Sequence, residues 1–183
     1  MAYDVEGFVG RFLILILVLR VICFMVHVQE QKSGRQRMIM NLTGDDVICT
    51  LELKPHPEGG YYREIYQDAP VDGSRGLTSS IYFLLRAGDR SHWHRFDAVE
   101  TWCYHAGSPL EVATWTAGRS VEKYRLGMDL SAGERPQLTI PAGSWQEAQT
   151  LGDWSLVGCV TTPAFQFAGF ELAPADWRPP NTS

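Results

Sequence analysis

The segment that decides the fold runs from Gly88 to Gly107 and reads GDRSHWHRFDAVETWCYHAG. His92 and His94 are separated by one residue, and side chains two apart on an extended strand point to the same face. Glu100 follows a short gap around residues 96–98 that is typical of a turn, and it begins a second extended segment. If the two segments pair, one face of a sheet carries two imidazoles and a carboxylate.

This set of side chains supports two chemistries. Neutral imidazole and carboxylate are usual ligands of a divalent metal such as Zn, Mn or Fe, so His92, His94 and Glu100 are candidate metal ligands. Without a metal, the same set performs acid–base chemistry, because a carboxylate beside a histidine favours the imidazolium and raises its pKa. The alternative is that the two histidines simply lie on a solvated strand face and have no function. The nearby glutamate favours a ligand or catalytic role over this alternative.

The composition limits the class of protein. A chain of 183 residues suits one domain, or one domain plus a tail. The net charge is −5 and basic residues form no long run, so we expect no nucleic-acid partner. The four cysteines are Cys23, Cys49, Cys103 and Cys159. They are far apart and show no Cys-x-x-Cys spacing, which favours buried reduced thiols in a reducing compartment over a disulfide framework.

Residues 1–40 form an apolar N-terminal extension unlike the rest of the chain. The apolar residues 12–28 are interrupted by Arg20, so the run is barely long enough to cross a bilayer. A central arginine costs roughly 2.5–3.5 kcal/mol on insertion scales. Three interpretations stay open: a signal anchor, a disordered or loosely helical appendage, or translation that starts at Met38 or Met40. We expect a cytoplasmic protein, with membrane anchoring through residues 12–28 as the alternative.

The pair Gly59-Gly60 marks a second informative segment. Two glycines let the backbone pass close to another segment or form a bulge, and they lead into a predicted strand at 61–66. On that strand, Arg63 is a candidate for binding an anionic ligand, because its guanidinium suits a carboxylate or phosphate. Tyr61 is a second candidate from the same strand. The alternative is a glycine-assisted corner with surface side chains.

Short strands separated by turn signals fill the remainder of the chain. Residues 41–46 resemble the end of a short helix or a turn, and there is almost no helical periodicity after them. We expect Phe165, Phe167 and Phe170 to fill the core, and residues from 174 onward to form a surface tail. This pattern predicts an all-β sandwich or barrel, with further strands at 49–54, 77–85, 110–116, 121–126, 136–141 and 154–161.

With these segments in view, the chain resembles the cupin superfamily, whose members are double-stranded β-helix barrels of the jelly-roll kind. The first cupin motif is matched by His92, His94, Glu100 and Gly107. The second motif is Pro-x-Gly followed by a histidine, and here Pro141 and Gly143 match it while Gln146 stands at the place of the histidine. More narrowly, the chain is similar to the DUF985 (cupin 5) branch, on the segments 56–64, 81–85, 91–95, 100–102, 107–110 and 141–145.

The resemblance extends over about residues 42–177 and implies a fold and a general role. It implies an all-β cupin jelly roll at 41–178, with a short N-terminal helical extension and a tail at 179–183. It also implies a barrel whose mouth holds a small polar molecule, in a homodimer. Most of the branch has no assigned reaction. A cupin metal usually has three histidines and a glutamate, whereas metal-free cupins similar to sugar epimerases use a histidine base and a tyrosine acid.

We therefore expect a small-molecule enzyme of isomerase, epimerase or lyase type. His94 would be the general base or a ligand, Glu100 would orient it, and Tyr104 or Tyr61 would be the acid. Trp145 and Gln146 of the second motif are expected to contact the ligand, together with Tyr61 and Arg63. The alternatives are a non-catalytic metabolite-binding cupin and a metal-dependent oxygenase-type cupin. A cofactor is either a divalent metal, Zn, Mn or Fe, or absent in the epimerase-like case.

Overall fold

The structure is a computed structural model that describes residues 42–180. The expectations for the N-terminal extension, including the apolar residues 12–28 and the alternative starts, lie outside the described residues. Between residues 42 and 180, no helix has both the length and the apolar character needed to cross a membrane.

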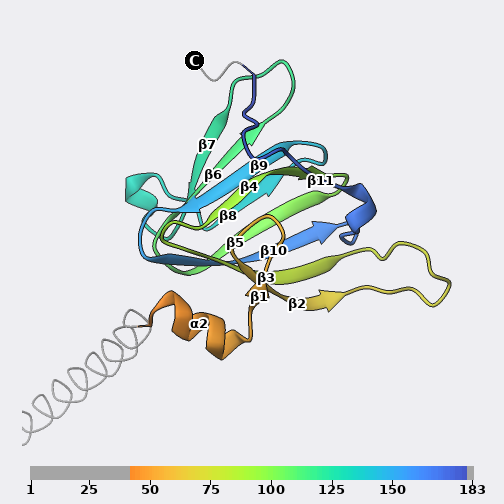
Figure 1. The fold of residues 1–183 in the computed structure, drawn as a ribbon, viewed down its shortest axis with the longest axis horizontal. Helices are drawn as coiled ribbons and strands as arrows, with labels where there is room; N and C mark the ends of the chain where they lie inside the picture. The colour runs from red at the N-terminus through yellow and green to blue at the C-terminus, as the bar shows by residue number, and fades with distance from the viewer. Residues whose placement is uncertain (1–41, 181–183) are drawn as a thin grey trace, which may run out of the picture. The chain divides into compact units, whose positions relative to one another are not determined.

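Two antiparallel β-sheets make up the barrel, as the sequence predicts (Figure 1). One sheet has the strand order β1 (Lys54–Pro55), β2 (Tyr61–Gln67), β3 (Ser79–Arg86), β10 (Trp154–Thr162), β5 (Val99–Gly107) and β8 (Gln137–Ile140). The other has the order β11 (Phe170–Leu172), β4 (Arg90–Phe96), β9 (Trp145–Thr150), β6 (Leu110–Trp115) and β7 (Glu122–Leu126).

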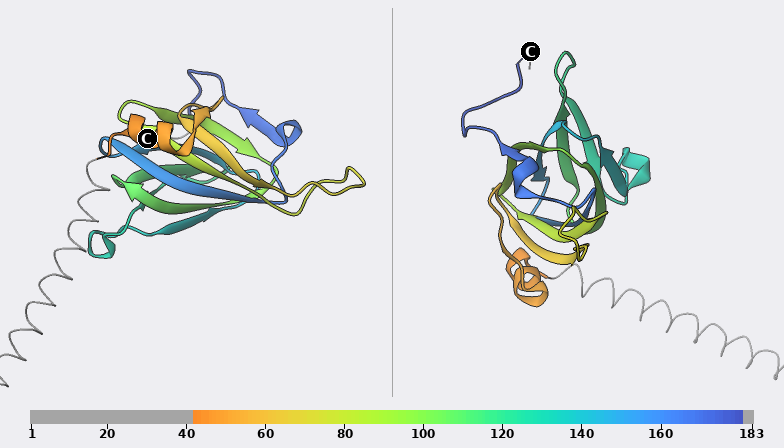
Figure 2. Two further views of the ribbon diagram at one scale, coloured as in Figure 1. Left: turned by 90° about the horizontal axis from the view of Figure 1, so that it is seen from below. Right: turned by 90° about the vertical axis from the view of Figure 1, so that its right-hand side faces the viewer.

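From β3 to β6, and again from β8 to β11, successive strands alternate between the sheets. The chain passes from β3 in the first sheet to β4 in the second, then to β5 and β6, and it repeats this crossing from β8 through β11. Such alternation winds the chain around the space between the sheets, which Figure 2 shows end-on in its right-hand view. Side chains alternate along each strand, so every second residue points into this space. The all-β prediction is confirmed.

The interior is filled by an apolar core at one part of the barrel. Its buried residues come from both sheets and include Phe83, Trp102, Val112, Ala148 and Cys159. Cys159 is buried, as expected, but Cys49 is exposed, and neither thiol is bonded to another cysteine among the described residues.

The strand predicted at 49–54 is wrong, because a helix, α2 (Gly44–Leu51), occupies most of it. Thr43 begins the helix with a capping box: its Oγ1 accepts from the Asp46 backbone N–H at 3.1 Å, and Asp46 Oδ2 accepts from the Thr43 N–H at 2.9 Å. Val47 packs with Leu84 and Trp154 against the outside of the first sheet. The helical turn therefore explains why Cys49 is exposed rather than buried.

One C-terminal prediction needs correction, because Phe167 is 64% exposed and does not fill the core. The residues after 174 lie mostly at the surface, as expected, and they are docked there, since the Trp177 ring lies 4.4 Å from the ring of Trp145. Trp93, Ala113 and Ala173 are the other buried members of this cluster. Its members lie on the outer face of the second sheet, because their strand neighbours point into the barrel. The two remaining irregular elements are short 3-10 turns, η1 (Leu130–Ala132) and η2 (Phe167–Gly169).

Candidate functional site

A β-bulge in β4 decides which of the two histidines faces the lumen. Ser91 pairs with Ala148 and His94 pairs with Gln146, so β4 has one residue more than β9 between these pairs. Ser91 and His94 are consequently both turned inward and buried, at 0% and 1% exposed.

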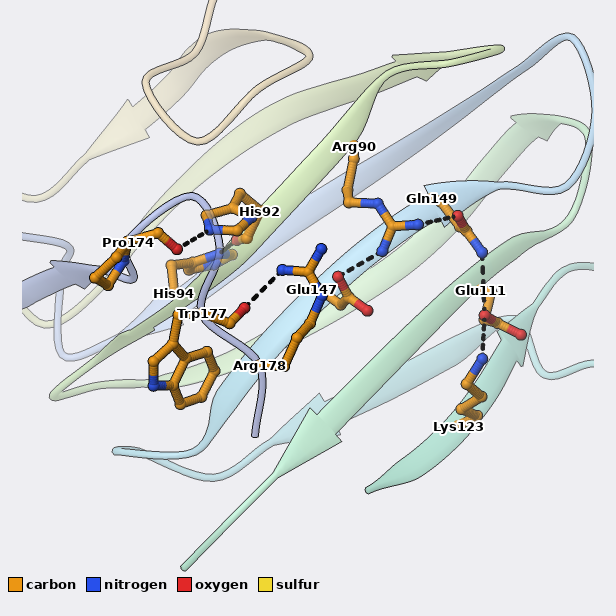
Figure 3. Close-up of polar contacts among 10 residues, drawn as sticks. All are labelled: Arg90, His92, His94, Glu111, Lys123, Glu147, Gln149, Pro174, Trp177 and Arg178. Atoms are coloured by element: carbon orange, nitrogen blue, oxygen red, sulfur yellow. Dashed lines mark hydrogen bonds and ion pairs between the residues drawn. The ribbon is translucent and has the colours of Figure 1, made fainter. Parts of the chain in front are cut away.

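His92 is not brought to the lumen with His94. Its Nε2 lies 2.9 Å from the carbonyl oxygen of Pro174, in the segment that docks on the outside of the sheet (Figure 3). The expectation that the two histidines share one face fails here, because strict alternation holds only for a strand without a bulge.

Glu100 and His94 meet through the side-chain amide of Gln146. The Nε2 of Gln146 lies 2.6 Å from Glu100 Oε2 and 2.9 Å from His94 Nε2. Trp102, two residues along β5, donates its Nε1–H to the same Glu100 oxygen at 2.8 Å. All these side chains are buried, so the carboxylate is held by two fixed N–H donors.

A second carboxyl, Glu58, reaches the same place. Its Oε2 lies 3.3 Å from His94 Nε2 and 3.6 Å from His56 Nδ1, while its Oε1 accepts the Ser91 hydroxyl at 2.8 Å. No role for Glu58 was expected from the sequence, although the segment 56–64 that contains it is part of the family resemblance.

The glycine pair after Glu58 explains this placement. Gly59 and Gly60 have φ of +108° and +72°, and a Cβ on Gly59 would lie 2.1 Å from the carbonyl oxygen of Arg90. Only glycine permits this backbone and this close approach. The His92 N–H then donates to the Glu58 carbonyl at 2.8 Å, which fixes the turn against β4. The close backbone approach expected from Gly59-Gly60 is confirmed.

The proton arrangement of His94 follows from its neighbours. Nδ1 lies 2.8 Å from the carbonyl oxygen of His92, which can only accept, so Nδ1 carries the proton and Nε2 of the neutral ring is bare. Burial lowers the pKa of His94, and the charge on Glu100 opposes that shift. The ring is therefore neutral near pH 7, with its lone pair directed at Gln146 and Glu58.

Both buried carboxyls have raised pKa values. Burial raises the pKa of Glu58 to about 7, against the opposing effects of His56 and the Ser91 hydrogen bond. Burial also raises the pKa of Glu100 to about 7, with His94 opposing the shift and the charge of Glu58 adding to it. Glu100 accepts two N–H groups and Glu58 one hydroxyl, so the anion is better stabilised on Glu100 and the proton on Glu58.

These groups form part of the wall of a cavity of about 110 Å³ in the lumen. Glu58, His94 and Glu100 line it, and Phe83 and Trp102 of the core also line it, so the apolar core forms its floor. Gln146 stands behind this wall and is not among the lining residues. A concave, largely apolar pocket with a few convergent polar groups is the usual form of a small-molecule site.

Other residues that we expected at the site lie elsewhere. Tyr61 accepts a hydrogen bond from Arg86 at 2.6 Å, and Arg63 pairs with Glu52 at 3.3 Å; both are outside the lumen. Their neighbours Tyr62 and Glu64 line the cavity instead. The glycine turn sets this alternation, and the sequence could not reveal which of the two sets points inward.

Tyr104 and Trp145 are also absent from the cavity wall. The Tyr104 hydroxyl donates to the carbonyl of Gly107 on its own strand, where it packs against the core. Trp145 belongs to the outer aromatic cluster with Trp177. The cavity is instead bounded by Phe96 and by Phe165, which we expected to fill the core.

The donor set does not fit a divalent metal. Within residues 42–180, no three His, Cys, Asp or Glu side chains are grouped so that they could hold an ion. His92 is turned outward, and the amide N–H of Gln146 points to the space between His94 Nε2 and Glu100 Oε2. A donor group at that point repels a cation, so no catalytic step below is derived through a metal.

Comparison with known proteins agrees with the fold. The family described as cupin superfamily (DUF985) matches residues 45–173. A crystal structure of a protein from Shewanella oneidensis is 46% identical, with a TM-score of 0.69 over 72% of this chain and 85% of that one. A hypothetical protein from Leishmania major is 30% identical, with a TM-score of 0.66 over 72% of this chain and 88% of that one.

More distant structures share the architecture alone. Oxalate decarboxylase from Bacillus subtilis is 17% identical, with a TM-score of 0.52 over 64% of this chain and 29% of that one. This likeness confirms the jelly-roll fold and carries no statement about the reaction. No curated protein matches the sequence.

Proposed function

The chain belongs to the cupin superfamily, in its DUF985 family, and we propose that its barrel catalyses proton transfer on a small polar molecule, as an isomerase, epimerase or lyase. One observation carries the proposal. An unprotonated imidazole nitrogen, His94 Nε2, lies 3.3 Å from the carboxyl of Glu58 at the wall of the cavity. Moving a proton from one substrate atom to another requires a group that accepts a proton and a group that donates one.

In this proposal His94 is the general base. Its Nε2 takes a proton from a substrate carbon next to a carbonyl group, and the electron pair of the broken C–H bond moves to the carbonyl oxygen. Glu100 stabilises the imidazolium that forms, because its negative charge raises the pKa of the buried His94 ring. The charge develops inside a buried site, where fixed dipoles act strongly.

Glu58 is the general acid and replaces the tyrosine that the sequence analysis considered. Its proton passes to the substrate oxygen or to the opposite face of the carbon. The imidazolium then returns its proton to Glu58 across the 3.3 Å contact, which restores both groups without any oxidant or reductant. A carboxyl with a pKa of about 7 suits this exchange at neutral pH.

The test is proton exchange with solvent. Full-length protein in D₂O is incubated with a panel of small sugars, hydroxy ketones, amines and organic acids, and ¹H NMR follows both conversion and deuterium incorporation. For any converted compound, we expect His94→Asn and Glu58→Gln to reduce the rate by about 100-fold or more. His92→Asn is the matched control, because it changes the same residue type on the same strand but outside the lumen.

The results separate two functions. Undiminished conversion by His94→Asn would exclude His94 as the base. Compounds that bind, by a thermal shift, and neither convert nor exchange deuterium would indicate the alternative function, a non-catalytic binding protein. In that case the same substitutions would change affinity alone.

A further inference from the structure

The cavity wall carries acidic side chains and no permanently charged basic ones among the described residues. Glu58, Glu64 and Glu100 line it, and within the described residues no lysine or arginine does. The remaining titratable bases of the wall are His56 and His94, and burial lowers the pKa of both, so they are neutral near pH 7. An anionic substrate would therefore meet the carboxylates of Glu64 and Glu100 and no compensating cation, which is costly beside the buried Glu100.

The arginines near the barrel are engaged elsewhere. Arg75 makes two hydrogen bonds to Asp97, at 2.8 and 2.9 Å. Arg95 donates to Glu171 at 2.7 Å on the outer face. Arg63, expected from the sequence as an anion clamp, pairs with Glu52. Since each guanidinium already has a carboxylate partner, none is free to serve an anion in the cavity.

The apolar part of the wall is aromatic. Phe96 and Phe165 contact each other edge to face, with ring centroids 5.7 Å apart, and Phe83 and Trp102 do so at 5.8 Å. All four line the cavity. Aromatic faces carry negative quadrupole charge, and a group of them beside carboxylates is the usual way in which proteins bind ammonium groups.

The polar groups of the wall also favour a ligand that donates hydrogen bonds. Trp102 and Gln67, which line the cavity, already donate to Glu100 and to the carbonyl of Phe165. The Glu64 and Glu100 carboxylates are acceptors, whereas the proton of Glu58 is directed at His94 Nε2. A protonated amine supplies up to three N–H donors and one positive charge, and it complements both the acceptors and the aromatic rings.

We propose that the ligand of this cavity is a small protonated amine, not a carboxylate or a phosphate. The inference rests on the proposed function only in that it places the substrate in the same cavity. The volume of about 110 Å³ suits a molecule of a few non-hydrogen atoms. The ammonium lies between the carboxylates and the aromatic rings, and the rest of the molecule faces His94.

Three probes with one hydrocarbon skeleton test the charge preference. Isobutylamine, isobutanol and isovalerate differ in headgroup charge, and their affinities for the full-length protein at pH 7 are measured by calorimetry or by NMR titration. We expect isobutylamine to bind about tenfold more tightly than isobutanol, and isovalerate to bind more weakly than both. Equal affinities, a preference for isovalerate, or no binding by any probe would overturn the inference.

Variants locate the binding site. Glu100→Gln, which removes a buried carboxylate, should weaken isobutylamine about tenfold and leave isobutanol nearly unchanged. Phe165→Leu should weaken the amine about threefold. Glu111→Gln is the matched control, because Glu111 accepts from Lys123 and Gln149 away from the cavity (Figure 3). An equal effect of the control would show that the amine binds to general surface charge.

The inference and the proposed function fail separately. If amines bind with this selectivity and none exchanges deuterium, the ligand class stands and the catalytic proposal falls. If a neutral or anionic compound is converted with dependence on His94, the catalytic proposal stands and the ligand class falls.

Discussion

His94 Nε2 and Glu58 Oε2 lie 3.3 Å apart, although the two side chains come from separate segments that meet only in the folded barrel. At this distance one proton can be shared between the atoms. Both groups are buried, and burial disfavours the imidazolium and the carboxylate alike, so the neutral pair with the proton on Glu58 is favoured. Loss of that proton leaves a buried charge, which makes stability dependent on pH.

The first prediction is that stability falls as the pH rises from 6.5 to 8.5. Glu58 and Glu100 have pKa values of about 7 in the folded state, against 4.5 for an unperturbed glutamate, so the folded state binds more protons than the unfolded state. This contribution is fully present below pH 4.5 and is lost as the pH rises through 7. Above pH 6.5 we expect a loss of about 1 kcal/mol per carboxyl in the free energy of unfolding, measured by urea denaturation.

The histidines set the lower limit of that window. His56 and His94 have lowered pKa values, so below pH 6.5 they bind protons in the unfolded state but not in the folded state. The free energy of unfolding therefore falls as the pH is lowered further, which is opposite to the effect of the two carboxyls. Glu58→Gln should remove about half of the decline above pH 6.5, whereas Glu111→Gln should not alter it. A decline that is as steep in Glu58→Gln as in the parent would refute the buried-proton interpretation.

The second prediction concerns the turn that positions Glu58. Gly59→Ala places a Cβ 2.1 Å from the carbonyl oxygen of Arg90 at a φ of +108°. We expect a loss of about 2–4 kcal/mol in the free energy of unfolding, from the backbone conformation and the steric clash together. Gly118→Ala is the control, with φ of +80° and nothing within 4 Å, and should cost about 1 kcal/mol. Equal losses would mean that the turn shifts freely away from Arg90.

The fold could be predicted from the sequence because the turn signals between strands are local, and because the cupin motifs occur together in one chain. Turn residues separate the short strands, and Gly59-Gly60 signals a close backbone approach that the structure contains. Gln146 could also be singled out, since it stands at the place of an expected histidine. Its position between His94 and Glu100 agrees with that reading of the motif.

The composition of the site could not be predicted, because it depends on pairing between distant segments. One extra residue in β4 turns His92 outward, and nothing in the spacing of His92 and His94 indicates a bulge. Glu58 enters the site only because its turn docks on β4. The helix at 44–51 could have been predicted from Thr43 and Asp46, since their spacing is that of a capping box.

The third prediction tests the docking of the C-terminal segment. Trp177 packs on Trp145 at 4.4 Å and on Trp93 at 5.8 Å, so Trp177→Ala removes a partly buried aromatic contact. We expect a loss of about 2–3 kcal/mol in the free energy of unfolding, together with a change in tryptophan fluorescence. Leu77→Ala, at a side chain that is 77% exposed, should change stability by less than about 0.5 kcal/mol. If Trp177→Ala has as little effect as the control, the segment is not docked in solution.

The last prediction follows from the position of Gln146. Its amide nitrogen lies 2.9 Å from His94 Nε2 and 2.6 Å from Glu100 Oε2, so a side chain at 146 reaches the point between two potential metal ligands. Gln146→His replaces the N–H donor by an imidazole, and two imidazoles and a carboxylate form a suitable set for Zn²⁺ or Co²⁺. We expect the variant to bind one Co²⁺ per chain, with visible absorption bands, and at least tenfold more tightly than the parent. Gln149→His, on the same strand but in the outer polar network with Arg90 and Glu111, should not gain this site (Figure 3). If the parent binds Co²⁺ as tightly as the variant does, the amide must move aside for the ion, and the donor argument against a native metal site is wrong.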